Sequence, residues 1–410
     1  MYKEIVGCRI CRSTDLVTVL DLGEQALTGI FPRSATDAVT VGPLILVKCM
    51  GGCGLLQLKH SYTLSEMYGD QYGYRSGLNA SMVRHLREKV DHIKQYGLLD
   101  KGDIVLDIGS NDGTTLAQYE LDDIRLVGMD PTSAKFKEYY VDNALAIADF
   151  FNADTFRKHF GEEKAKIVTS FSMFYDLEDP VAFVKEIRGI IHDNGIWVLE
   201  QSYLPMMLET NSYDTVCHEH LEYYTLAQIE WMMDRCDMRV VDVSLNGVNG
   251  GSFSVVVQPN TGQLPVAESV AKLRLSEQLG LLDDLAIYSA FRDRVMNSRI
   301  ALIDFLREAS EKNKTVVALG ASTKGNVVLQ YCNITGSMVS SVGEVNPDKY
   351  GAVTPGTHIP ILDESDVLAD NPDYVLILPW HFRDFFEEQE KYKSLNLVFA
   401  LPYLEIRHAK

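Results

Sequence analysis

Short apolar runs alternate with helix-forming segments between residues 105 and 202, and this alternation restricts the fold more than any other feature of the chain. The runs typical of buried strands are 105–109, 125–130, 167–173 and 195–202. The segments typical of helices lie between or after them, at 115–120, 133–141, 152–160 and 180–192. Strands that alternate with helices predict a doubly wound α/β fold with a parallel sheet. Two further apolar runs, 239–245 and 252–259, are predicted to close this sheet.

A second α/β unit is predicted near the end of the chain. It follows a long, polar, helix-prone stretch at residues 265–312. Its predicted strands are 315–322, 341–347, 375–380 and 397–402. A chain of 410 residues is longer than one hydrophobic core usually supports. We therefore predict three domains, with boundaries at 1–65, 66–260 and 261–410.

Four of the seven cysteines form two close pairs near the N-terminus. Cys8 and Cys11 are separated by two residues, and Cys49 and Cys53 by three, beside several glycines that suit a tight turn. Structural zinc takes four ligands tetrahedrally, and close pairs of cysteines on turns supply them two at a time. Four thiolates leave no open position, so we expect a structural rather than a catalytic zinc ion. The alternative is two unrelated pairs of thiols.

The charge balance restricts the partners. The formal net charge is −19, from 57 acidic and 38 basic residues, which makes nucleic acid and anionic membranes poor partners. The first residues show no signal-peptide pattern, and no apolar run approaches the ~20 residues of a membrane span. We expect a cytoplasmic protein, in which seven cysteines indicate metal binding, catalysis or packing rather than disulfides.

The sharpest motif is the turn after the first predicted strand, Val105 to Gly113. It contains Asp107, Gly109, Asn111 and Asp112. In a doubly wound sheet, ligands bind at the carboxyl ends of the strands, and glycine lets the backbone approach a ligand closely. Asp107 can order the turn or meet the cationic end of a ligand.

Two more strand ends carry acidic residues. Asp130 ends the second strand, where its two carboxylate oxygens suit the hydroxyl groups of a ribose. Asp149 and Phe150 follow a third strand, where they could hold an adenine, Asp149 by accepting from its amine and Phe150 by stacking. The alternative is that Asp130 and Asp149 are only turn residues at strand ends.

Electrostatics distinguish between two cofactors for this site. A nicotinamide dinucleotide requires a G-x-G-x-x-G turn, whereas this turn places the acidic Asp112 where a pyrophosphate would lie. A carboxylate repels phosphate, while S-adenosylmethionine carries a sulfonium and an amine and no phosphate. The turn therefore favours S-adenosylmethionine.

Residues 213–224 gather polar and titratable side chains after the fourth strand. Cys217, His218, Glu219 and His220 are consecutive, and Tyr224 ends the segment. A metalloprotease helix would need H-E-x-x-H, so we reject that function. A general base near neutral pH is a more natural role for a histidine here, and one of the two histidines is expected to be structural. If the segment is extended, His218 and His220 point to one side and Glu219 to the other.

Taken together, the chain resembles the zinc-containing sugar-nucleotide C-methyltransferases of deoxysugar biosynthesis, typified by the 3-C-methyltransferases of branched sugars. The resemblance covers essentially the whole chain. Besides the cysteine pairs, the cofactor turn and the His-Glu-His-Leu segment, its motifs are residues 20–23, 249–252, 320–326 and 355–360. It implies a zinc knuckle, a central class I (Rossmann-like) methyltransferase domain and a C-terminal Rossmann-like domain that helps to hold the sugar nucleotide.

The resemblance also implies a reaction and its residues. The family methylates a carbon beside the ketone of a nucleotide-linked keto sugar, after a base has removed a proton to form an enolate. The position that matches this base is His220, with Glu219 beside it. The family has a tyrosine where this chain has Cys217. It also has a histidine at the end of the strand that is predicted here at 167–173, where this chain has Tyr175 or Asp176. These departures affect which sugar is used and which carbon is methylated.

Further substrate contacts are expected by resemblance. Lys324, on a glycine-flanked turn with Asn326, is expected to contact the diphosphate; a solvated surface lysine is the alternative. The remaining candidates are Tyr72, Tyr74, Tyr224 and His381. Two other functions stay open: an O- or N-methyltransferase for another small molecule, and a non-catalytic protein that binds S-adenosylmethionine. We expect a monomer or a small homo-oligomer.

Overall fold

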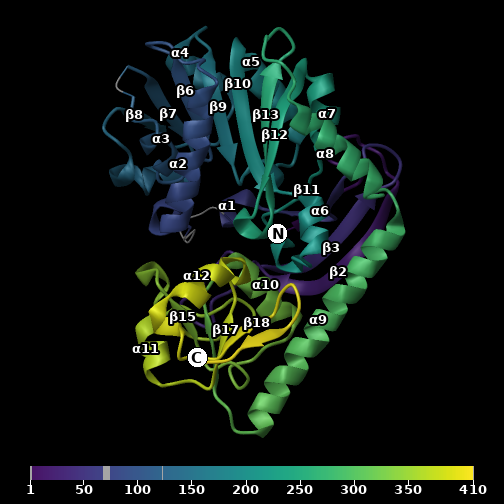
Figure 1. Cartoon of the computed structure of the whole chain (residues 1–410), viewed down its shortest axis with the longest axis vertical. Helices are drawn as coiled ribbons and strands as arrows, with labels where there is room; N and C mark the ends of the chain where they lie inside the picture. The colour runs from purple at the N-terminus through teal and green to yellow at the C-terminus, as the bar shows by residue number, and fades with distance from the viewer. Residues whose placement is uncertain (1, 68–73, 122, 410) are drawn as a thin grey trace.

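The computed structural model describes residues 2–67, 74–121 and 123–409. Figure 1 shows a large sheet domain at the top, an N-terminal sheet in purple beside it, and a C-terminal α/β domain in yellow below. The long helix α9 (Leu285–Glu311) runs along one side and leads into the C-terminal domain. Within the described ranges, no helix is long and apolar enough to cross a membrane.

The central sheet has seven strands in the order β8-β7-β6-β9-β10-β13-β12. Their bounds are β6 Ile104–Ile108, β7 Arg125–Met129, β8 Ala144–Ile147, β9 Ala165–Phe171, β10 Ile191–Ser202, β12 Met238–Asn246 and β13 Ser252–Pro259. The first five of these strands in the order are parallel, and β13 is antiparallel to both of its neighbours. The predicted doubly wound sheet is confirmed, including its two closing strands.

Helices cover the central sheet, so β6 is buried along its whole length. Their bounds are α1 Leu64–Met67, α2 Ala80–Gln95, α3 Thr114–Ala117, α4 Ala153–Phe160, α5 Pro180–Ile190, α6 Leu204–Glu209, α7 Leu226–Arg235 and α8 Glu268–Leu279. Asn79 and Asn152 accept backbone hydrogen bonds at the starts of α2 and α4. Asp179 does so for α5, where Pro180 occupies the first turn.

The helix predicted at 133–141 is wrong. This stretch forms two short 3-10 helices, η2 (Pro131–Ala134) and η3 (Lys137–Tyr139). The hydroxyl group of Tyr140 lies 2.7 Å from the Ser110 hydroxyl and donates to the Asn111 carbonyl at 3.1 Å. These contacts hold the segment against the cofactor turn, and tertiary contacts of this kind override a weak helix propensity.

The N-terminal region forms more regular structure than a small knuckle. Its four-stranded antiparallel sheet has the order β11-β4-β3-β2, and a separate pair joins β1 to β5. The bounds are β1 Tyr2–Glu4, β2 Leu16–Ala26, β3 Val41–Cys49, β4 Leu56–Leu58, β5 His60–Tyr62 and β11 Glu222–Tyr223. Because β11 comes from the middle of the chain, the N-terminal sheet is completed by the segment that carries His218 and His220.

The C-terminal domain is a second, smaller doubly wound fold. Its sheet has the order β16-β15-β14-β17-β18-β19, with β19 antiparallel at the edge. The strands are β14 Val316–Leu319, β15 Val342–Glu344, β16 Ile361–Asp363, β17 Tyr374–Ile377, β18 Leu397–Phe399 and β19 Glu405–Arg407. The helices are α10 Thr323–Tyr331, α11 Glu364–Ala369 and α12 Arg383–Glu388. The predicted second α/β unit is confirmed.

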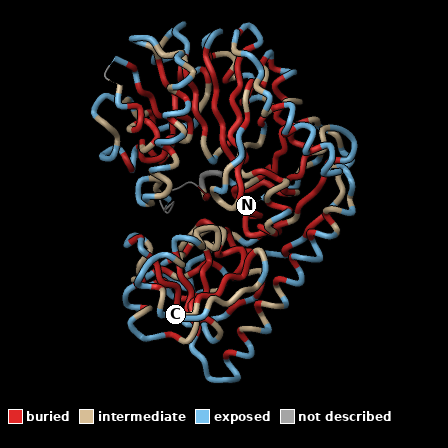
Figure 2. Tube along the Cα trace, viewed as in Figure 1, coloured by how far each residue is buried: buried red, intermediate tan, exposed pale blue. Residues whose placement is uncertain are grey.

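One continuous hydrophobic core joins the N-terminal sheet to the C-terminal domain. It includes Leu46 of β3, Leu302 of α9 and Val342 of β15, and Figure 2 shows buried segments along this whole path. The C-terminal domain is therefore packed against the rest of the molecule. Both doubly wound sheets have a point where the strand order reverses, at β6/β9 and at β14/β17, and ligands bind at such points.

Candidate active site

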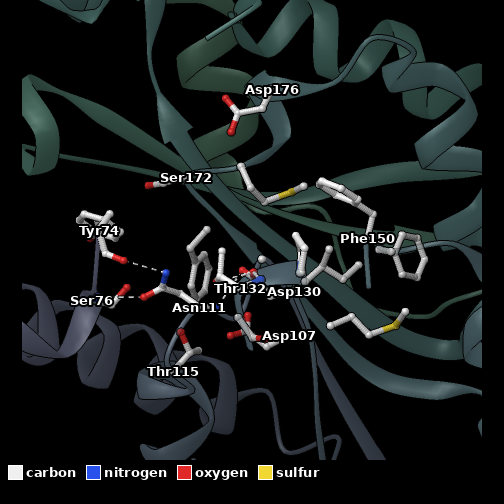
Figure 3. A pocket seen from close by; sticks show the side chains of 18 of the residues that line it. Tyr74, Ser76, Asp107, Asn111, Thr115, Asp130, Thr132, Phe150, Ser172 and Asp176 are labelled. Atoms are coloured by element: carbon white, nitrogen blue, oxygen red, sulfur yellow. Dashed lines mark hydrogen bonds between the residues drawn. The ribbon is translucent and has the colours of Figure 1, made fainter. Parts of the chain in front are cut away.

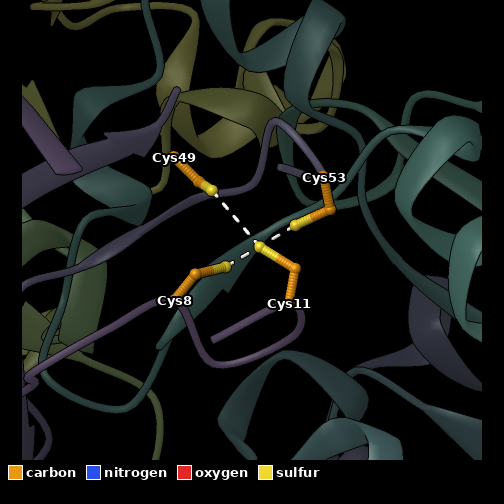
Figure 4. Close-up of side chains that lie close together, drawn as sticks. All are labelled: Cys8, Cys11, Cys49 and Cys53. Atoms are coloured by element: carbon orange, nitrogen blue, oxygen red, sulfur yellow. Dashed lines mark hydrogen bonds between the residues drawn. The ribbon is translucent and has the colours of Figure 1, made fainter. Parts of the chain in front are cut away.

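The four predicted cysteine ligands converge (Figure 4). All four Sγ atoms of Cys8, Cys11, Cys49 and Cys53 lie within 4.8 Å of one another, and two pairs are 3.5 Å apart. A tetrahedral zinc ion with Zn–S bonds of about 2.3 Å places its sulfur ligands about 3.8 Å apart. The observed distances bracket this value, so the four thiols fit a structural zinc site without an open position.

The first pocket lies at the carboxyl ends of β6, β7 and β9 (Figure 3), which is the reversal point of the central sheet. Three aspartates line it, namely Asp107, Asp130 and Asp176. Among the described residues that line this pocket there is no lysine, arginine or histidine. Such a lining suits a cationic ligand such as S-adenosylmethionine and disfavours a phosphate.

Asp107 and Gly109 form the floor of the first pocket. Thr169 donates a hydrogen bond of 2.5 Å to the Asp107 carboxyl group, and burial raises the pKa of Asp107 to about 7. Gly109 has a φ of 71°, and a Cβ atom here would lie 3.1 Å from Met173. A larger residue at 109 would therefore be strained and would crowd the pocket wall.

Asp130 is held in place from two sides. Its Oδ2 accepts from the Asn111 backbone at 2.9 Å, and its Oδ1 accepts from the backbone and hydroxyl of Thr132, each at 2.6 Å. Each carboxylate oxygen can accept two hydrogen bonds, so Oδ2 keeps capacity for one ligand hydroxyl. Phe150 lines the same pocket, whereas the exposed Asp149 is not among the lining residues.

Asn111 and Asp112 hold the segment that covers the pocket. The Asn111 amide donates to the Tyr74 carbonyl at 3.2 Å and accepts from the Ser76 backbone at 3.1 Å. The Asp112 carboxylate accepts from the Gly77 backbone at 2.9 Å. Asn111 lines the pocket, whereas Asp112 is buried behind it. Asp112 thus contacts the covering segment.

A second pocket adjoins the first. Tyr74, Met82, Ser172 and Asp176 line both. The second pocket is also lined by Tyr175, Glu219, His220, Asn249, Ser322, Thr323, Lys324, Pro379, His381 and Phe382. The last six follow β14 and β17, at the reversal point of the C-terminal sheet. The two reversal points therefore open onto adjoining pockets.

His220 is held as one neutral tautomer. Its Nδ1 lies 2.9 Å from the carbonyl oxygen of Thr215. Because a carbonyl oxygen can only accept, Nδ1 carries the hydrogen, and the neutral ring keeps its lone pair on Nε2. Burial and the charge of Lys324 lower the pKa of His220 to about 3, so the ring is neutral at physiological pH. Tyr175 packs on it with ring centroids 4.2 Å apart.

Glu219 lies beside His220, and its side chain is buried and closely packed. The Thr28 hydroxyl donates to its Oε2 at 3.4 Å, and burial raises its pKa. A Cβ atom on Gly29 would lie 2.1 Å from Glu219 Oε1, so glycine at 29 makes room for this carboxyl group. The raised pKa favours the protonated acid, which can donate a hydrogen bond.

The expected alternation of side chains at 218–220 is wrong. His220 donates its backbone hydrogen bond to the Cys217 carbonyl at 3.2 Å, so the segment turns instead of extending. Glu219 and His220 consequently line the same pocket, while His218 is fully buried behind them against Tyr62. Cys217 is fully buried, and burial raises its pKa well above the ordinary value, which keeps the thiol protonated.

Lys324 and His381 reach the second pocket from the C-terminal domain. Lys324 Nζ donates to the Asn249 carbonyl at 2.6 Å. Burial lowers the pKa of Lys324, and the nearby Asp214 opposes that shift. Burial and Lys324 lower the pKa of His381 well below its ordinary value. This side of the pocket offers a cation and the first residues of α10 to a ligand.

The other predicted contacts have different positions. Asn326 is buried and donates to the Thr28 carbonyl at 2.7 Å, so it joins α10 to the loop beneath Glu219. Tyr224 is fully buried and stacks on Phe174 with ring centroids 5.4 Å apart. Tyr72 lies outside the described residues.

Several residues of the site escaped the sequence prediction. Ser172 follows β9, where the rule that ligands bind at strand ends could have found it, whereas Tyr175 was considered only as the alternative to Asp176. Asp214 accepts from the indole nitrogen of Trp380 at 2.9 Å, across the boundary between the two α/β domains. These two residues are 166 positions apart, and no local sequence pattern brings them together.

Comparisons with known proteins agree with this architecture. Three family descriptions match in order along the chain: "Putative zinc binding domain" at 8–68, "Methyltransferase domain" at 82–243 and "C-methyltransferase C-terminal domain" at 247–402. The C-methyltransferase NovU of Streptomyces niveus is 28% identical over 421 residues, covering 99% of this chain and 97% of that protein. The tRNA U34 carboxymethyltransferase of Campylobacter lari is 25% identical over 127 residues, covering 28% and 41%.

A solved structure of the plantazolicin methyltransferase BpumL in complex with SAH is 12% identical, covers 45% of this chain and 87% of that chain, and has a TM-score of 0.36. The central sheet and its acidic pocket define a class I methyltransferase that uses S-adenosylmethionine. The chain is an S-adenosylmethionine-dependent methyltransferase that carries, in order, a zinc-binding domain, a methyltransferase domain and a C-methyltransferase C-terminal domain, and it is similar over its whole length to the C-methyltransferase NovU. The predicted fold class and the predicted cofactors, S-adenosylmethionine and zinc, are thereby confirmed.

Proposed function

We propose that this enzyme methylates a carbon atom beside the ketone of a nucleotide-linked keto-deoxysugar, with His220 as the general base. The observation that carries the proposal is the state of His220. Its Nδ1 hydrogen is held by Thr215, its Nε2 keeps a lone pair, and its ring lines a pocket that adjoins the methyl-donor pocket. Removal of the proton beside a ketone requires a base that lies within hydrogen-bond reach of that proton.

The proposed proton transfer uses the residues of the second pocket. His220 Nε2 takes the proton beside the ketone, and the electrons of the broken C–H bond form an enolate. A protonated Glu219, whose pKa is raised by burial, can donate a hydrogen bond to a developing negative charge. S-adenosylmethionine in the first pocket would supply the methyl group to the enolate carbon, with its sulfonium–methyl bond breaking to leave the neutral thioether S-adenosylhomocysteine. Asp176, Ser172 and Tyr74 line both pockets, where they can align the acceptor carbon with the donor.

In the proposal, the C-terminal domain holds the nucleotide diphosphate. Lys324 supplies a positive charge, and Ser322 and Thr323 at the start of α10 line the same pocket, where the N-terminus of the helix favours an anion. A diphosphate there would compete with the Asn249 carbonyl for Lys324 Nζ. A substrate without a nucleotide gives Lys324 and His381 no comparable role, which disfavours an O- or N-methyltransferase for another small molecule.

Incubation in deuterated water with a panel of nucleotide-linked 4-keto-6-deoxysugars tests the proposal. Mass spectrometry follows methyl transfer with S-adenosylmethionine and solvent exchange of the proton beside the ketone. The expected result is a methyl group on carbon, and loss of both signals in His220→Asn with methyl-donor binding unchanged. Turnover by His220→Asn at the wild-type rate would eliminate His220 as the base. A methyl group on oxygen, identified by NMR of the product, would show that the enzyme methylates oxygen and would overturn the proposed reaction.

A further inference from the structure

The zinc knuckle, here the two turns 8–11 and 49–53, is connected to the segment that carries His220. Arg9 lies between the two cysteines of the first turn, and its side chain is buried beside Glu222 of β11. The Arg9 Nε and Glu222 Oε1 atoms are 3.6 Å apart, and their side chains are 2% and 0% exposed. Glu222 is two residues beyond His220.

Arg9 is fixed by other contacts as well. Its guanidinium donates to the Leu58 carbonyl at 2.6 Å and to the Ser61 hydroxyl at 2.7 Å. Leu58 in turn donates its backbone N–H to the Leu221 carbonyl at 2.8 Å, directly after His220. A planar guanidinium can meet several acceptors at once, which a lysine in the same place could not do. Arg9 therefore links the first cysteine turn to β11 directly, through Glu222, and indirectly, through Leu58.

The second cysteine turn makes an independent connection. The amide group of Gln228 donates to the Cys53 carbonyl at 2.9 Å. The same side chain accepts from the backbone of Thr225 at 2.9 Å, at the start of α7. The segment 221–228 is thus held by both halves of the zinc knuckle. On its other side, Leu221 donates to the Tyr175 carbonyl at 2.7 Å, and Tyr175 packs on His220.

We propose that the zinc knuckle acts as a clamp that positions His220, with Arg9 and Glu222 as positioning residues for proton abstraction. This inference rests on the base role proposed above for His220. It assigns the zinc site a role in the reaction although the metal has no open coordination position. Because the first pocket is built from β6, β7 and β9, loosening of the clamp leaves the methyl donor bound.

The test uses Arg9→Met and Glu222→Ala in the full-length zinc-loaded protein. The matched control is Glu230→Ala, which removes the Arg274–Glu230 ion pair between α7 and α8, away from both pockets. Zinc content and methyl-donor affinity by calorimetry identify variants that are correctly folded. We expect at least a tenfold fall in kcat for the two clamp variants, with methyl-donor affinity within twofold of wild type, and no change in kcat for the control.

Amide hydrogen exchange gives a readout that is independent of turnover. We expect faster exchange at 217–225 in the clamp variants, and unchanged exchange at 104–112. If the other variants fail to fold, Gln228→Ala breaks the second connection, together with the cap of α7 at Thr225, and leaves the Arg9 contacts in place. Unchanged exchange at 217–225 in folded variants, or unchanged kcat, overturns the clamp. Faster exchange in the clamp variants, together with full turnover by His220→Asn, would show that His220 is not the base. The connection between the zinc knuckle and residues 217–225 would still stand.

Discussion

His218 and His220 are two residues apart and have similarly lowered pKa values, but their side chains lie in different places. Burial lowers the pKa of both to about 3. His218 is fully buried, with Nδ1 3.4 Å from the Thr28 hydroxyl, and supports the loop from within. His220 lines the second pocket. The expectation that one of the two histidines is structural is met by His218.

The buried His218 predicts a loss of stability in mild acid. The unfolded chain binds a proton at this residue below a pKa of about 6.5, whereas the folded chain does so only below about 3. Lowering the pH between these values therefore favours the unfolded state, by about 2 kcal/mol at pH 5. Urea unfolding at pH 7.5 and pH 5.0 measures this loss. In His218→Gln this part of the pH dependence should disappear, and an identical pH dependence would contradict the assignment.

Lys324 is predicted to influence both the nucleotide and the base. In Lys324→Met, the KM for the sugar nucleotide should rise at least tenfold, because a charge-assisted contact to the diphosphate is lost. The pKa of His220 should rise, since the charge of Lys324 is one cause of its depression, and the acid limb of kcat should move to higher pH. Lys324→Arg keeps the charge and should retain more activity. An unchanged KM in Lys324→Met would place the diphosphate elsewhere.

Among the elements, the segment 74–79 makes the covering side of both pockets. Arg75 lies over the Tyr139 ring at 3.6 Å and contacts Asp112 at 3.4 Å, while Asn79 caps α2. Together with the backbone hydrogen bonds from Ser76 to Asn111 and from Gly77 to Asp112, these contacts fix the segment to the cofactor turn. The turn that lines the first pocket therefore also sets the position of Tyr74, which lines both pockets.

Gly77 provides a direct test of this connection. A Cβ atom at 77 would lie 2.8 Å from the Asp112 carboxylate and 3.0 Å from the Thr114 hydroxyl. Gly77→Ala should therefore displace the segment and weaken methyl-donor binding by about 1–3 kcal/mol, the usual cost of overpacking. Gly336→Ala is the matched control, since nothing lies within 4 Å of its added Cβ. Calorimetric titration of both variants with the donor decides, and equal affinities would contradict the connection.

Local sequence patterns predicted the elements that are recognised by the spacing of residue types within a short segment. Most strands of the two doubly wound sheets were predictable because each is a short apolar run between turn residues, whereas β16 and β19 were not predicted. The cysteine ligands were predictable because their spacing is itself the geometric requirement. The N-terminal sheet was not, since β11 is more than 160 residues from its partner β4, paired as Glu222 with Gln57. The orientation of Glu219 was missed because a turn at Cys217 replaced the expected extended chain.

At the scale of the whole molecule, the two doubly wound domains are arranged so that the reversal points of their sheets open onto adjoining pockets. The N-terminal sheet and α9 hold this arrangement through a common hydrophobic core. Polar contacts cross directly between the domains at Lys324–Asn249 and Trp380–Asp214. In the proposed function, the methyl donor occupies the first pocket and the acceptor the second, and the two meet where Tyr74, Ser172 and Asp176 line both pockets. Neither domain alone forms the second pocket.

Trp380 should report the filling of the second pocket. Of the three tryptophans, Trp197 is fully buried in the core, whereas Trp380 donates to Asp214 and its ring contacts that of His381, which lines the second pocket. Titration with nucleoside diphosphates should change the fluorescence in a saturable way, because the anion alters the charge around the indole. S-adenosylmethionine, bound in the other pocket, should cause a much smaller change. Trp380→Phe should lose the response and raise the KM for the sugar nucleotide. A response that persists in Trp380→Phe would place the nucleotide away from the reversal point of the C-terminal sheet.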